Sequence, residues 1–538
     1  MKIISTITEI EFGPDPADIV YQLKESEYIC FLDSSLVPDK YSRFSYIGWQ
    51  PSFIIKSHGL KNEFINISKK IKNFSYQHPL KFFKENVNDF IFHDEKDKKD
   101  NIRIVQINEG KARELNLSYK NRDSNVPDFI GGFMGYFSYD LKDHIEKLPH
   151  TTTDDQGLPI IYLGFYNKLL AYDHERDKWH FIRNFIVNNE KGRLGEIFGE
   201  SDLIGSGDGM GEIIRRNSSE IKTIKERFKT GPVNIKAAII EKYLRNPVSG
   251  LKIKSDLTKD EYVSGVNRTR DHIYAGDIYQ VNFSQRFKAE VTVEAMDLYY
   301  ILREKNAAPF SAYLSFPEFS IGSSSPERFL YLKDGIIETR PIKGTMPRGK
   351  DRQEDLKNAR VLAASIKDGA ELNMIVDLER NDLGKFCYYG TVKVIEHAVI
   401  EKYARVFHTV STITGQVKKG IDVADIIRAT FPGGSITGAP KIRAMEIIDE
   451  LELVNRGLYT GSIGYISIDN TMDLNIVIRT FIMKDNRFYY NVGGGIVADS
   501  RPGMEYQETL DKGIALEDTL NYFRHENLLK FMQEKAGS

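Results

Sequence analysis

The chain has 538 residues, 41 % of them hydrophobic and 28 % charged, and a formal net charge of −2 at pH 7. These values are typical of a globular protein with a large core, organised as one large domain or as two to four smaller ones. They exclude a strongly basic or acidic surface, so we expect neither nucleic-acid binding nor electrostatic attachment to a membrane.

The chain contains two cysteines, Cys30 and Cys387, which are too few for a disulfide framework or a cysteine-rich zinc site. Residues 1–12 mix charged and apolar side chains and lack the uninterrupted apolar core of a signal peptide. No stretch is apolar over the length that crosses a bilayer. The sequence therefore predicts a cytoplasmic protein.

Short runs of apolar, β-branched and aromatic residues predict strands over residues 28–32, 44–48, 52–56, 160–166, 168–172 and 179–187. The strands at 160–166 and 168–172 are expected to pair. Residues 94–123 are rich in Lys, Asp, Asn and Glu, which predicts an exposed loop. The glycines in the apolar run 129–137 lack the G-x-G-x-x-G spacing and predict close backbone packing.

A change of composition separates the two halves of the chain. Residues 199–232 carry four alternate glycines from Gly205 to Gly211, a run of charges and a closing Gly231-Pro232. Such a segment is typical of a domain boundary or an insertion. The sequence therefore predicts two regions, residues 1–225 and 226–538.

The second region opens with a helix and a strand. Thr258 and Glu261 form a capping box, and Gly276 ends the predicted helix. Residues 279–287 alternate strictly and predict a strand whose polar face carries Gln280, Asn282 and Ser284. That face either meets solvent or lines a buried pocket.

A predicted hairpin carries the first candidate for chemistry. Residues 329–332 and 336–339 are strand-like and flank an Asp-Gly turn. Lys343 follows between Pro341 and Gly344, on backbone that we expect to interrupt the regular ladder. Taken alone, Lys343 is most simply a solvated cation, and only the candidate site residues later in the chain favour a functional role.

Three glutamates are candidates for a cation site. Residues 353–382 predict two helices with a break near residues 368–369, and Glu371 lies on a largely apolar stripe. A carboxylate there needs a metal or a salt bridge, with Arg380 as the nearest candidate partner. Glu505 and Glu508 share a helix face, and with Glu371 they would suit Mg²⁺. For Glu508 alone, a solvated position is the simpler interpretation.

Residues 433–441 place glycines between two predicted helices, 423–431 and 441–454. Free backbone N–H groups at a helix N-terminus bind anions. Ala439-Pro440 follows Gly438 where a nucleotide-binding P-loop has Lys-Ser/Thr, so we expect a smaller anion such as a carboxylate. Strands are predicted over residues 461–468, 473–481 and 487–492, and Arg479 on the second is expected to have a fixed anionic partner.

Three motifs occur in a specific order: Asp377-Leu378-x-Arg380-Asn381-Asp382, Gly438-Ala439-Pro440-Lys441 and Gly495-Ile496-Val497-Ala498-Asp499-Ser500. On these motifs the chain resembles the chorismate-utilising enzymes, densely over residues 255–525 and more loosely before. The resemblance implies an α+β fold of the anthranilate synthase component I type, with two antiparallel β-sheets packed orthogonally and helices outside. It makes residues 226–538 the chorismate-binding catalytic region.

Single residues narrow the resemblance. Gln280 stands where isochorismate and salicylate synthases carry a lysine base. Lys343 matches the aminodeoxychorismate synthase component I group, whereas anthranilate synthases usually have Ala in that motif. The resemblance thus implies amination of chorismate at C4 to 4-amino-4-deoxychorismate, for 4-aminobenzoate and folate synthesis. Anthranilate synthase component I is the alternative.

The resemblance also implies a role for each site residue. Lys343 would attack C2 as a nucleophile, and Glu327 would be the general acid for the leaving hydroxyl. The other residues implied at the ring are His408, Thr345 and Gln280. Mg²⁺ on Glu371 and Glu505, with Glu508 nearby, would hold the ring carboxylate. The residues implied in binding the substrate are Ser435, Gly493, Gly494 and Gly495 at the ring carboxylate, Tyr459 and Arg479 at the enolpyruvyl carboxylate, and Arg380 in support.

Two further expectations concern partners and regulation. The sequence has no Gly-x-Cys-x-Gly elbow, so ammonia would come from a separate glutamine amidotransferase subunit or from solution. Residues 31–34 occupy the place of the Leu-Leu-Glu-Ser element through which anthranilate synthases sense tryptophan. Asp33 is one methylene shorter than the glutamate of that element, so we predict no strong inhibition by tryptophan. Whether tryptophan binds there as a structural ligand stays open.

Overall fold

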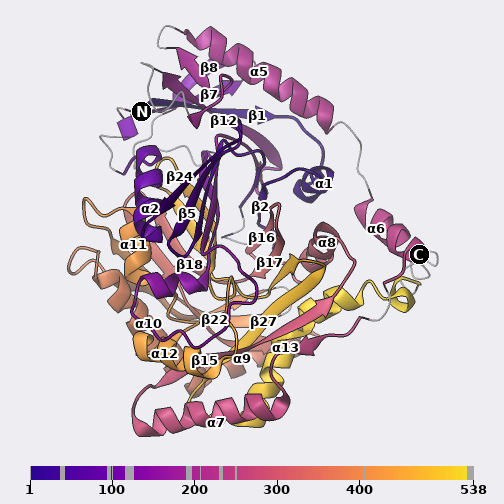
Figure 1. Cartoon of the computed structure of the whole chain (residues 1–538), viewed down its shortest axis with the longest axis vertical. Helices are drawn as coiled ribbons and strands as arrows, with labels where there is room; N and C mark the ends of the chain where they lie inside the picture. The colour runs from indigo at the N-terminus through magenta and orange to yellow at the C-terminus, as the bar shows by residue number, and fades with distance from the viewer. Residues whose placement is uncertain are drawn as a thin grey trace.

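The computed structural model describes residues 2–36, 41, 43–93, 98–99, 101–108, 110–115, 126–188, 197–205, 208–228, 234–248, 251–403 and 406–529. These residues form two large β-sheets with helices around them (Figure 1). The predicted α+β class is confirmed.

The larger sheet contains fifteen strands in the described part of the chain and is mostly antiparallel, with parallel pairs β1–β7 and β12–β13. Its strands are, in spatial order, β14 (Lys254–Ser255), β15 (Gln280–Glu290), β27 (Arg487–Ile496), β26 (Thr480–Lys484), β17 (Ser320–Ser325), β16 (Phe310–Ser315), β2 (Ile29–Asp33), β3 (Phe44–Gly48), β11 (Lys168–Asp173), β12 (Lys178–Asn188), β1 (Lys2–Ile10), β7 (Ile102–Asn108) and β8 (Lys111–Leu115), with β13 (Leu203–Gly205) on β12 and β23 (Gly438–Ala439) on β15.

The smaller sheet has twelve strands among the described residues, and all its pairs are antiparallel. Its strands are, in spatial order, β20 (Ile342–Pro347), β22 (Val406–Gln416), β19 (Ile336–Arg340), β18 (Arg328–Lys333), β25 (Met472–Asn475), β24 (Ser462–Ser467), β9 (Gly132–Phe137), β10 (Ile161–Tyr166), β4 (Phe53–His58), β5 (Lys61–Asn66) and β6 (Ile71–Tyr76), with β21 (Lys393–Lys402) on β22.

Helices surround these sheets, with α5 beside β1 and β12 at one end of the molecule and α7, α12 and α13 near β15 at the other (Figure 1). The helices are α1 (Pro16–Gln22), α2 (Pro79–Val87), α5 (Met210–Arg227), α6 (Ile235–Arg245), α7 (Lys259–Ala275), α8 (Ala295–Lys305), α9 (Arg352–Ala363), α10 (Ile366–Gly384), α11 (Val423–Thr430), α12 (Lys441–Leu451) and α13 (Pro502–Asn521), with short 3₁₀ helices at Asn88–Phe90 and Tyr139–His144.

Local signals were reliable predictors. The Thr258–Glu261 capping box opens α7, and Gly276 closes it with φ +81°. The Asp334-Gly335 turn joins β18 to β19, with both residues at positive φ as a tight hairpin turn requires. A Cβ on Gly135 of β9 would lie 2.0 Å from the carbonyl oxygen of Tyr162, which confirms close backbone packing.

Four predictions of elements were wrong. Strands β10 and β11 do not pair, because the chain passes from the smaller to the larger sheet at Asn167. The strand predicted over 473–481 is likewise divided into β25 and β26, one in each sheet. Within 94–123, β7 and β8 replace the expected loop, since alternate apolar residues of β7 are buried; residues 94–97, 100, 109 and 116–123 lie outside the described residues. The helix break lies at residues 364–365, because Ser365 caps α10.

Both sheets mix strands from the two predicted regions. In the larger sheet β16 pairs with β2, and in the smaller sheet β24 pairs with β9. Helix α5, within the predicted boundary segment, anchors to β1 through Asn217, whose side chain hydrogen-bonds Thr6 and Thr8. The division at residue 225 therefore stays a prediction about sequence regions.

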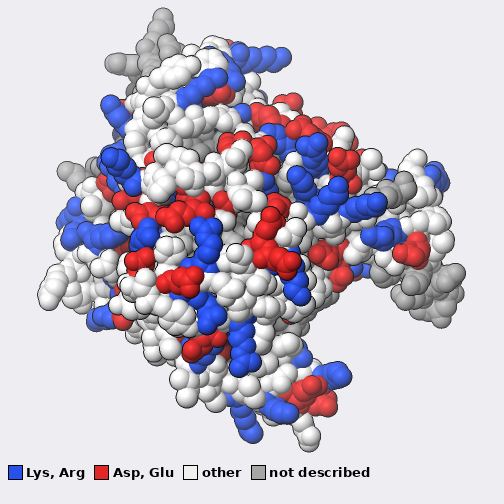
Figure 2. Space-filling model, turned by 60° about the horizontal axis from the view of Figure 1, so that its bottom comes forward, with Lys and Arg blue, Asp and Glu red and all other residues white. Residues whose placement is uncertain are grey.

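The surface charge, the apolarity of the helices and the cysteines agree with the expectations from composition. Lys and Arg lie interspersed with Asp and Glu across the face that Figure 2 shows, without a broad field of one sign. None of the helices in the described ranges is both long and apolar enough to cross a membrane. Cys30 and Cys387 are both buried and free.

Candidate active site

The candidate site lies where the chain passes from one sheet to the other. Glu327 occupies the crossing from β17 to β18, and Arg479 occupies the crossing from β25 to β26. The two crossings are bonded together: Ile476 N–H donates to the Glu327 carbonyl at 2.9 Å, and the Ser325 hydroxyl donates to the Ile476 carbonyl at 2.5 Å. Arg479 has φ +52°, so it leaves the strand conformation that the sequence had predicted.

Lys343 lies on β20 of the smaller sheet. The prediction that its backbone interrupts the regular ladder is confirmed by a register shift between Lys343 and Thr345, although β20 pairs with β22 on both sides of the shift. Gly344 provides that shift with φ +71°, and a Cβ there would lie 2.9 Å from Leu362. The amine of Lys343 donates to the carbonyl oxygen of Ser435 at 3.1 Å. Burial lowers the pKa of Lys343, although Glu371 and Glu327 oppose the change.

Glu327 is the buried carboxyl group beside this amine. Burial raises the pKa of Glu327, opposed by Ser435, Lys343 and the N–H group of Ile342. The Ile342 N–H donates to the carboxylate at 3.4 Å. Burial shifts the pKa of Lys343 down and that of Glu327 up, which are the directions that nucleophilic attack by the amine and proton donation by the acid require.

The strand pair β15–β27 forms the adjoining wall. Asn282 pairs with Gly495, and Ser284 pairs with Gly493. A Cβ on Gly495 would lie 2.1 Å from Gln280 Nε2 and 3.7 Å from Lys343 Nζ, so a larger residue there would displace the Gln280 amide. Gln280 Oε1 is buried and has no hydrogen-bond partner among the described residues. The polar face of β15 is therefore buried, and the solvent-facing alternative is wrong.

His408 lies on β22, which pairs with β20, the strand that carries Lys343. Its Nδ1 is 3.0 Å from the hydroxyl of Thr345. Burial lowers the pKa of His408 to about 3, helped by the charge of Arg479, so the ring is neutral at ordinary pH. Its Nε2 is buried and, within the described chain, has no partner. The neutral ring can thus line a substrate and exchange one hydrogen bond with it.

Arg479 and Tyr459 supply polar groups on the other side. No ion pair of Arg479 is found among the described residues, in which the charges of Tyr403 and Glu327 act on its pKa. Burial lowers the pKa of Arg479 and raises that of Tyr459 to about 12, so Tyr459 keeps its proton. A guanidinium without an ion pair among the described residues and a protonated phenol are each suited to binding a carboxylate ligand.

The loop between α11 and α12 is held in place by contacts of Lys441 and by the pairing of β23 with β15. Lys441 forms an ion pair with Asp382 and donates to the carbonyl oxygens of Thr430 and Pro432 at 2.8 Å each. Gly438 and Ala439 form β23 on β15, and the Asn282 N–H donates to the Thr437 carbonyl at 2.7 Å. These contacts hold Ser435 close to both Lys343 and Glu327.

The three predicted cation ligands come from α10 and α13: Glu505 and Glu508 approach the glycine strand β27, and the charge of Glu371 acts on Lys343. A Cβ on Gly494 would lie 3.5 Å from Glu505 Oε2 and 3.6 Å from Glu508 Oε1. Burial raises the pKa of Glu371 and of Glu505. For Glu508 burial acts in the same direction, but Lys512, Lys367 and Lys343 together outweigh it and the pKa falls. Glu371 lies 3.8 Å from Lys367, and Glu508 lies 2.8 Å from Lys512.

The donor chemistry of these carboxylates fits a hard cation. Among the described residues no group of three or more His, Cys, Asp or Glu side chains is close enough to hold a metal by itself. Mg²⁺ in proteins is commonly held by one or two carboxylates, with waters and substrate oxygens completing the shell. Glu371 and Glu505 are the pair that fits this pattern, since both are mostly buried and raised in pKa by desolvation.

Two residues differ from expectation. Arg380 does not pair with Glu371; it is exposed and forms an ion pair with Asp377 at 2.8 Å. Lys512, which was not predicted, pairs with Glu508, donates to the Gly493 carbonyl at 2.9 Å and contributes charge at Lys343. The i,i+4 spacing of Glu508 and Lys512 was the signal that could have identified it.

Comparison with known proteins identifies the family. The family model described as chorismate binding enzyme matches residues 66–518. The chain belongs to this family of chorismate-binding enzymes. It is 35 % identical to anthranilate synthase component 1 of Acetivibrio thermocellus, over 93 % of this chain and 92 % of the relative. It is 40 % identical to aminodeoxychorismate synthase component 1 of Escherichia coli (strain K12), over 71 % of this chain and 76 % of the relative.

A solved structure supports the same fold for this chorismate-utilising enzyme. The crystal structure of anthranilate synthase component I from Streptococcus pneumoniae TIGR4 superposes with a TM-score of 0.67 at 29 % identity, covering 89 % of this chain and 92 % of the other. The fold of the anthranilate synthase component I type is thereby confirmed. Relatives bearing the two synthase names are similarly close, so the comparisons leave the specific reaction undecided.

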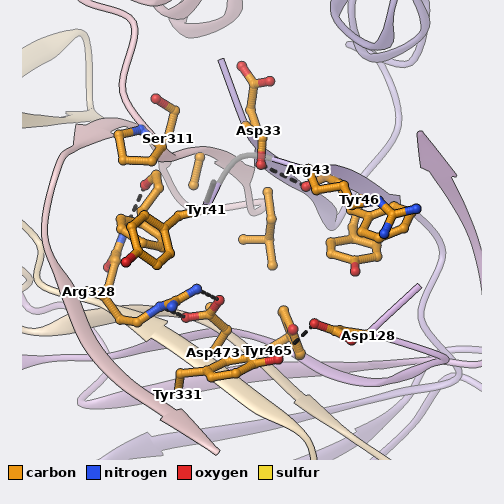
Figure 3. A pocket seen from close by; sticks show the side chains of 18 of the residues that line it. Asp33, Tyr41, Arg43, Tyr46, Asp128, Ser311, Arg328, Tyr331, Tyr465 and Asp473 are labelled. Carbon is orange, nitrogen blue, oxygen red and sulfur yellow. Dashed lines mark hydrogen bonds and ion pairs between the residues drawn. The ribbon is translucent and has the colours of Figure 1, made fainter. Parts of the chain in front are cut away.

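A separate cavity of about 450 Å³ lies at residues 31–34, between the two sheets (Figure 3). Aromatic rings of Tyr46, Phe310 and Tyr465 line it, and the Arg328–Asp473 ion pair forms part of one wall. The carboxylate of Asp33 accepts hydrogen bonds from the Tyr299 hydroxyl at 2.9 Å and from Arg303 at 2.6 Å. The cavity matches the element predicted to correspond to a tryptophan sensor, and its acid is already engaged with protein groups.

Proposed function

We propose that the protein aminates chorismate at C4 to give 4-amino-4-deoxychorismate, as the aminodeoxychorismate synthase component I of 4-aminobenzoate and folate synthesis. The observation that carries the proposal is the position of Lys343. It is a lysine with a lowered pKa, surrounded by Glu327, Gln280, Gly495 and Ser435. A lysine in such a place is suited to covalent catalysis, which splits one difficult substitution into two easier steps.

In the first step the neutral amine of Lys343 bonds to C2 of chorismate. The ring double bonds shift, the C4–O bond breaks, and Glu327 gives its proton so that the hydroxyl leaves as water. In the second step ammonia bonds to C4, the double bonds shift back, and the C2–N bond to Lys343 breaks. The new ammonium group returns a proton to Glu327. Water has then been exchanged for ammonia at one carbon, with both protein groups restored.

The remaining site residues hold the substrate in this proposal. Arg479 and Tyr459 bind the enolpyruvyl carboxylate, because they offer a phenol donor and a cation that forms no ion pair within the part of the chain that the structure describes. Ser435 and the Gly493–Gly495 backbone bind the ring carboxylate. Mg²⁺, when bound by Glu371 and Glu505, would neutralise that carboxylate. Gln280, Thr345 and neutral His408 line the ring.

We further propose that a separate glutamine amidotransferase subunit supplies the ammonia and that the reaction takes place in the cytoplasm. The chain matches relatives named component 1 of their synthases, which is in keeping with a second component. Free ammonium is the simplest substitute for that subunit in an assay.

Anthranilate synthesis is the second candidate, favoured by the relative from Acetivibrio thermocellus that aligns with 93 % of this chain. The two reactions differ in where nitrogen is added and in whether pyruvate is lost. Incubation with chorismate, Mg²⁺ and ammonium, followed by chromatography and mass spectrometry, distinguishes them. We expect 4-amino-4-deoxychorismate without anthranilate; anthranilate as the main product would overturn the proposal.

A further inference from the structure

A single buried arginine outside the predicted site connects three of its walls. Arg456 lies in the segment between α12 and β24 and is 2 % exposed. A guanidinium group has five N–H donors, and all five are used. They go to both carboxylate oxygens of Glu452 at 2.9 and 2.8 Å, the Ile436 carbonyl at 3.0 Å, the Thr460 hydroxyl at 3.3 Å and the Asn282 carbonyl at 2.5 Å.

Each acceptor other than Glu452 belongs to a segment that carries a predicted substrate-binding residue. Asn282 is two residues from Gln280 on β15. Ile436 directly follows Ser435, and Thr460 directly follows Tyr459. The guanidinium carbon also lies 4.8 Å from the ring centre of Tyr139 and 5.8 Å from that of Tyr459. These segments are far apart in sequence, and Arg456 contacts all three.

Glu452 completes the arrangement from the opposite side. Its Oε1 accepts hydrogen bonds from the Ser284 N–H at 2.9 Å and from the Ser284 hydroxyl at 2.8 Å. Ser284 in turn pairs with Gly493 across β15 and β27. The Arg456–Glu452 pair therefore also reaches the strand that carries the glycines of the site.

We propose that Arg456 is a positioning residue for chorismate: it sets the spacing between the Gln280 strand, the Ser435 loop and Tyr459. A core arginine kept only for stability would not need its acceptors on three ligand-bearing segments. The planar fork fixes directions as well as distances, which lysine cannot reproduce because its ammonium group has three donors at one point. The inference rests on chorismate binding and not on which product is made.

The primary test is Arg456→Lys, which keeps the charge next to Glu452. Initial rates of chorismate consumption with Mg²⁺ and ammonium give KM and kcat, and thermal unfolding reports the fold. We expect KM for chorismate to rise tenfold or more, kcat to change less than KM, and a cooperative unfolding transition to remain. A wild-type KM in the folded variant would overturn the proposal.

Arg183→Lys is the matched control, because Arg183 is also a buried arginine, 1 % exposed and paired with Asp202 and Glu220, but lies on β12, away from β15 and β27 in the strand order of the larger sheet. We expect KM within twofold of wild type even where the melting temperature falls as much as in Arg456→Lys. Equal changes of KM in the two variants would show that loss of stability alone moves KM and would reject a positioning role.

A double variant keeps the proposal testable if Arg456→Lys does not fold. Arg456→Met with Glu452→Gln leaves no unpaired charge, and the glutamine carbonyl still accepts from Ser284. It should fold and show the raised KM. If both Arg456 variants unfold, Arg456 belongs to the core only and the proposal is rejected. Wild-type protein that converts chorismate to anthranilate would overturn the proposed function and leave this test intact.

Discussion

The side-chain amine of Lys343 lies 3.1 Å from the main-chain carbonyl oxygen of Ser435. This contact joins β20 of the smaller sheet to the loop that β23 fastens to the larger sheet. A neutral carbonyl stabilises an ammonium group less than a carboxylate would, so the contact orients the amine without fixing its charge. The proposed nucleophile and the loop proposed to bind the ring carboxylate are thereby brought to one place.

The acidic side chains make a prediction about metal dependence. Glu371→Gln and Glu505→Gln should each raise the Mg²⁺ concentration for half-maximal turnover by about tenfold or more, because a hard cation prefers charged oxygen ligands. Glu508→Gln should have a smaller effect, since Lys512 already engages that carboxylate at 2.8 Å. Turnover measured across a Mg²⁺ titration tests this. Wild-type behaviour of both Glu371→Gln and Glu505→Gln at limiting Mg²⁺ would refute the assignment.

The cavity at residues 31–34 leads to a prediction about tryptophan. Asp33 is shorter than the matching glutamate and its carboxylate is held by Arg303 at 2.6 Å and by Tyr299. An incoming α-amino group would have to compete with these bonds. We therefore expect micromolar tryptophan to leave the rate of chorismate consumption nearly unchanged. Strong inhibition in that range would favour the anthranilate synthase alternative.

Glu379 predicts an unusual dependence of stability on pH. It is buried next to Leu378 under Gly434, accepts a hydrogen bond from Thr339 at 2.9 Å, and burial raises its pKa to about 8 from 4.5. The folded state thus binds a proton that the unfolded state releases, so its contribution is fully present below pH 4.5 and is lost as pH rises to about 8.

Glu379→Gln is the variant that isolates this effect. It keeps an acceptor for Thr339 and removes the charge, so its stability relative to wild type should increase between pH 5 and pH 8, by at most about 5 kcal/mol. Chemical unfolding at several pH values measures the difference, and wild type corrects for other buried acids such as Asp473. A difference independent of pH would contradict the prediction.

How much the sequence could predict depends on whether a signal was local. The capping box of α7 and the turn at Asp334-Gly335 are local and were found in their predicted places. The crossing of the chain between sheets at Asn167 and before Thr480 is not local, because neighbouring apolar runs look alike whichever sheet they join. Strand β7 was missed because its charged surroundings concealed the alternation that buries it beside β1.

The site divides in the same way. Motif order was enough to select residues that the fold then brings together, including Lys343, Glu327 and Gln280. It did not predict the counter-ions Lys367 and Lys512 or the five contacts of Arg456, since these depend on how helices and loops meet. For Arg380 the predicted salt bridge with Glu371 was wrong, since its partner is Asp377, whereas its supporting role in substrate binding stays a prediction.

Replacement of Lys343 tests the covalent route. Lys343→Ala should lower formation of 4-amino-4-deoxychorismate by about two orders of magnitude or more, because it removes the proposed nucleophile. Stability should change by about 1 kcal/mol or less, since Lys343 is partly exposed and contributes mainly its aliphatic stem. Lys343→Arg is the control that keeps a cation without a nucleophilic amine, and it should be as inactive as Lys343→Ala.

The most direct test is intact-protein mass spectrometry. The protein is incubated with chorismate and Mg²⁺ in the absence of ammonia, and the reaction is then quenched rapidly. The account predicts an adduct of chorismate less one water, which maps to the peptide containing Lys343 and is absent from Lys343→Ala. Absence of any adduct, together with unchanged turnover in Lys343→Ala, would contradict the covalent mechanism and reopen the choice between C4 and C2 amination.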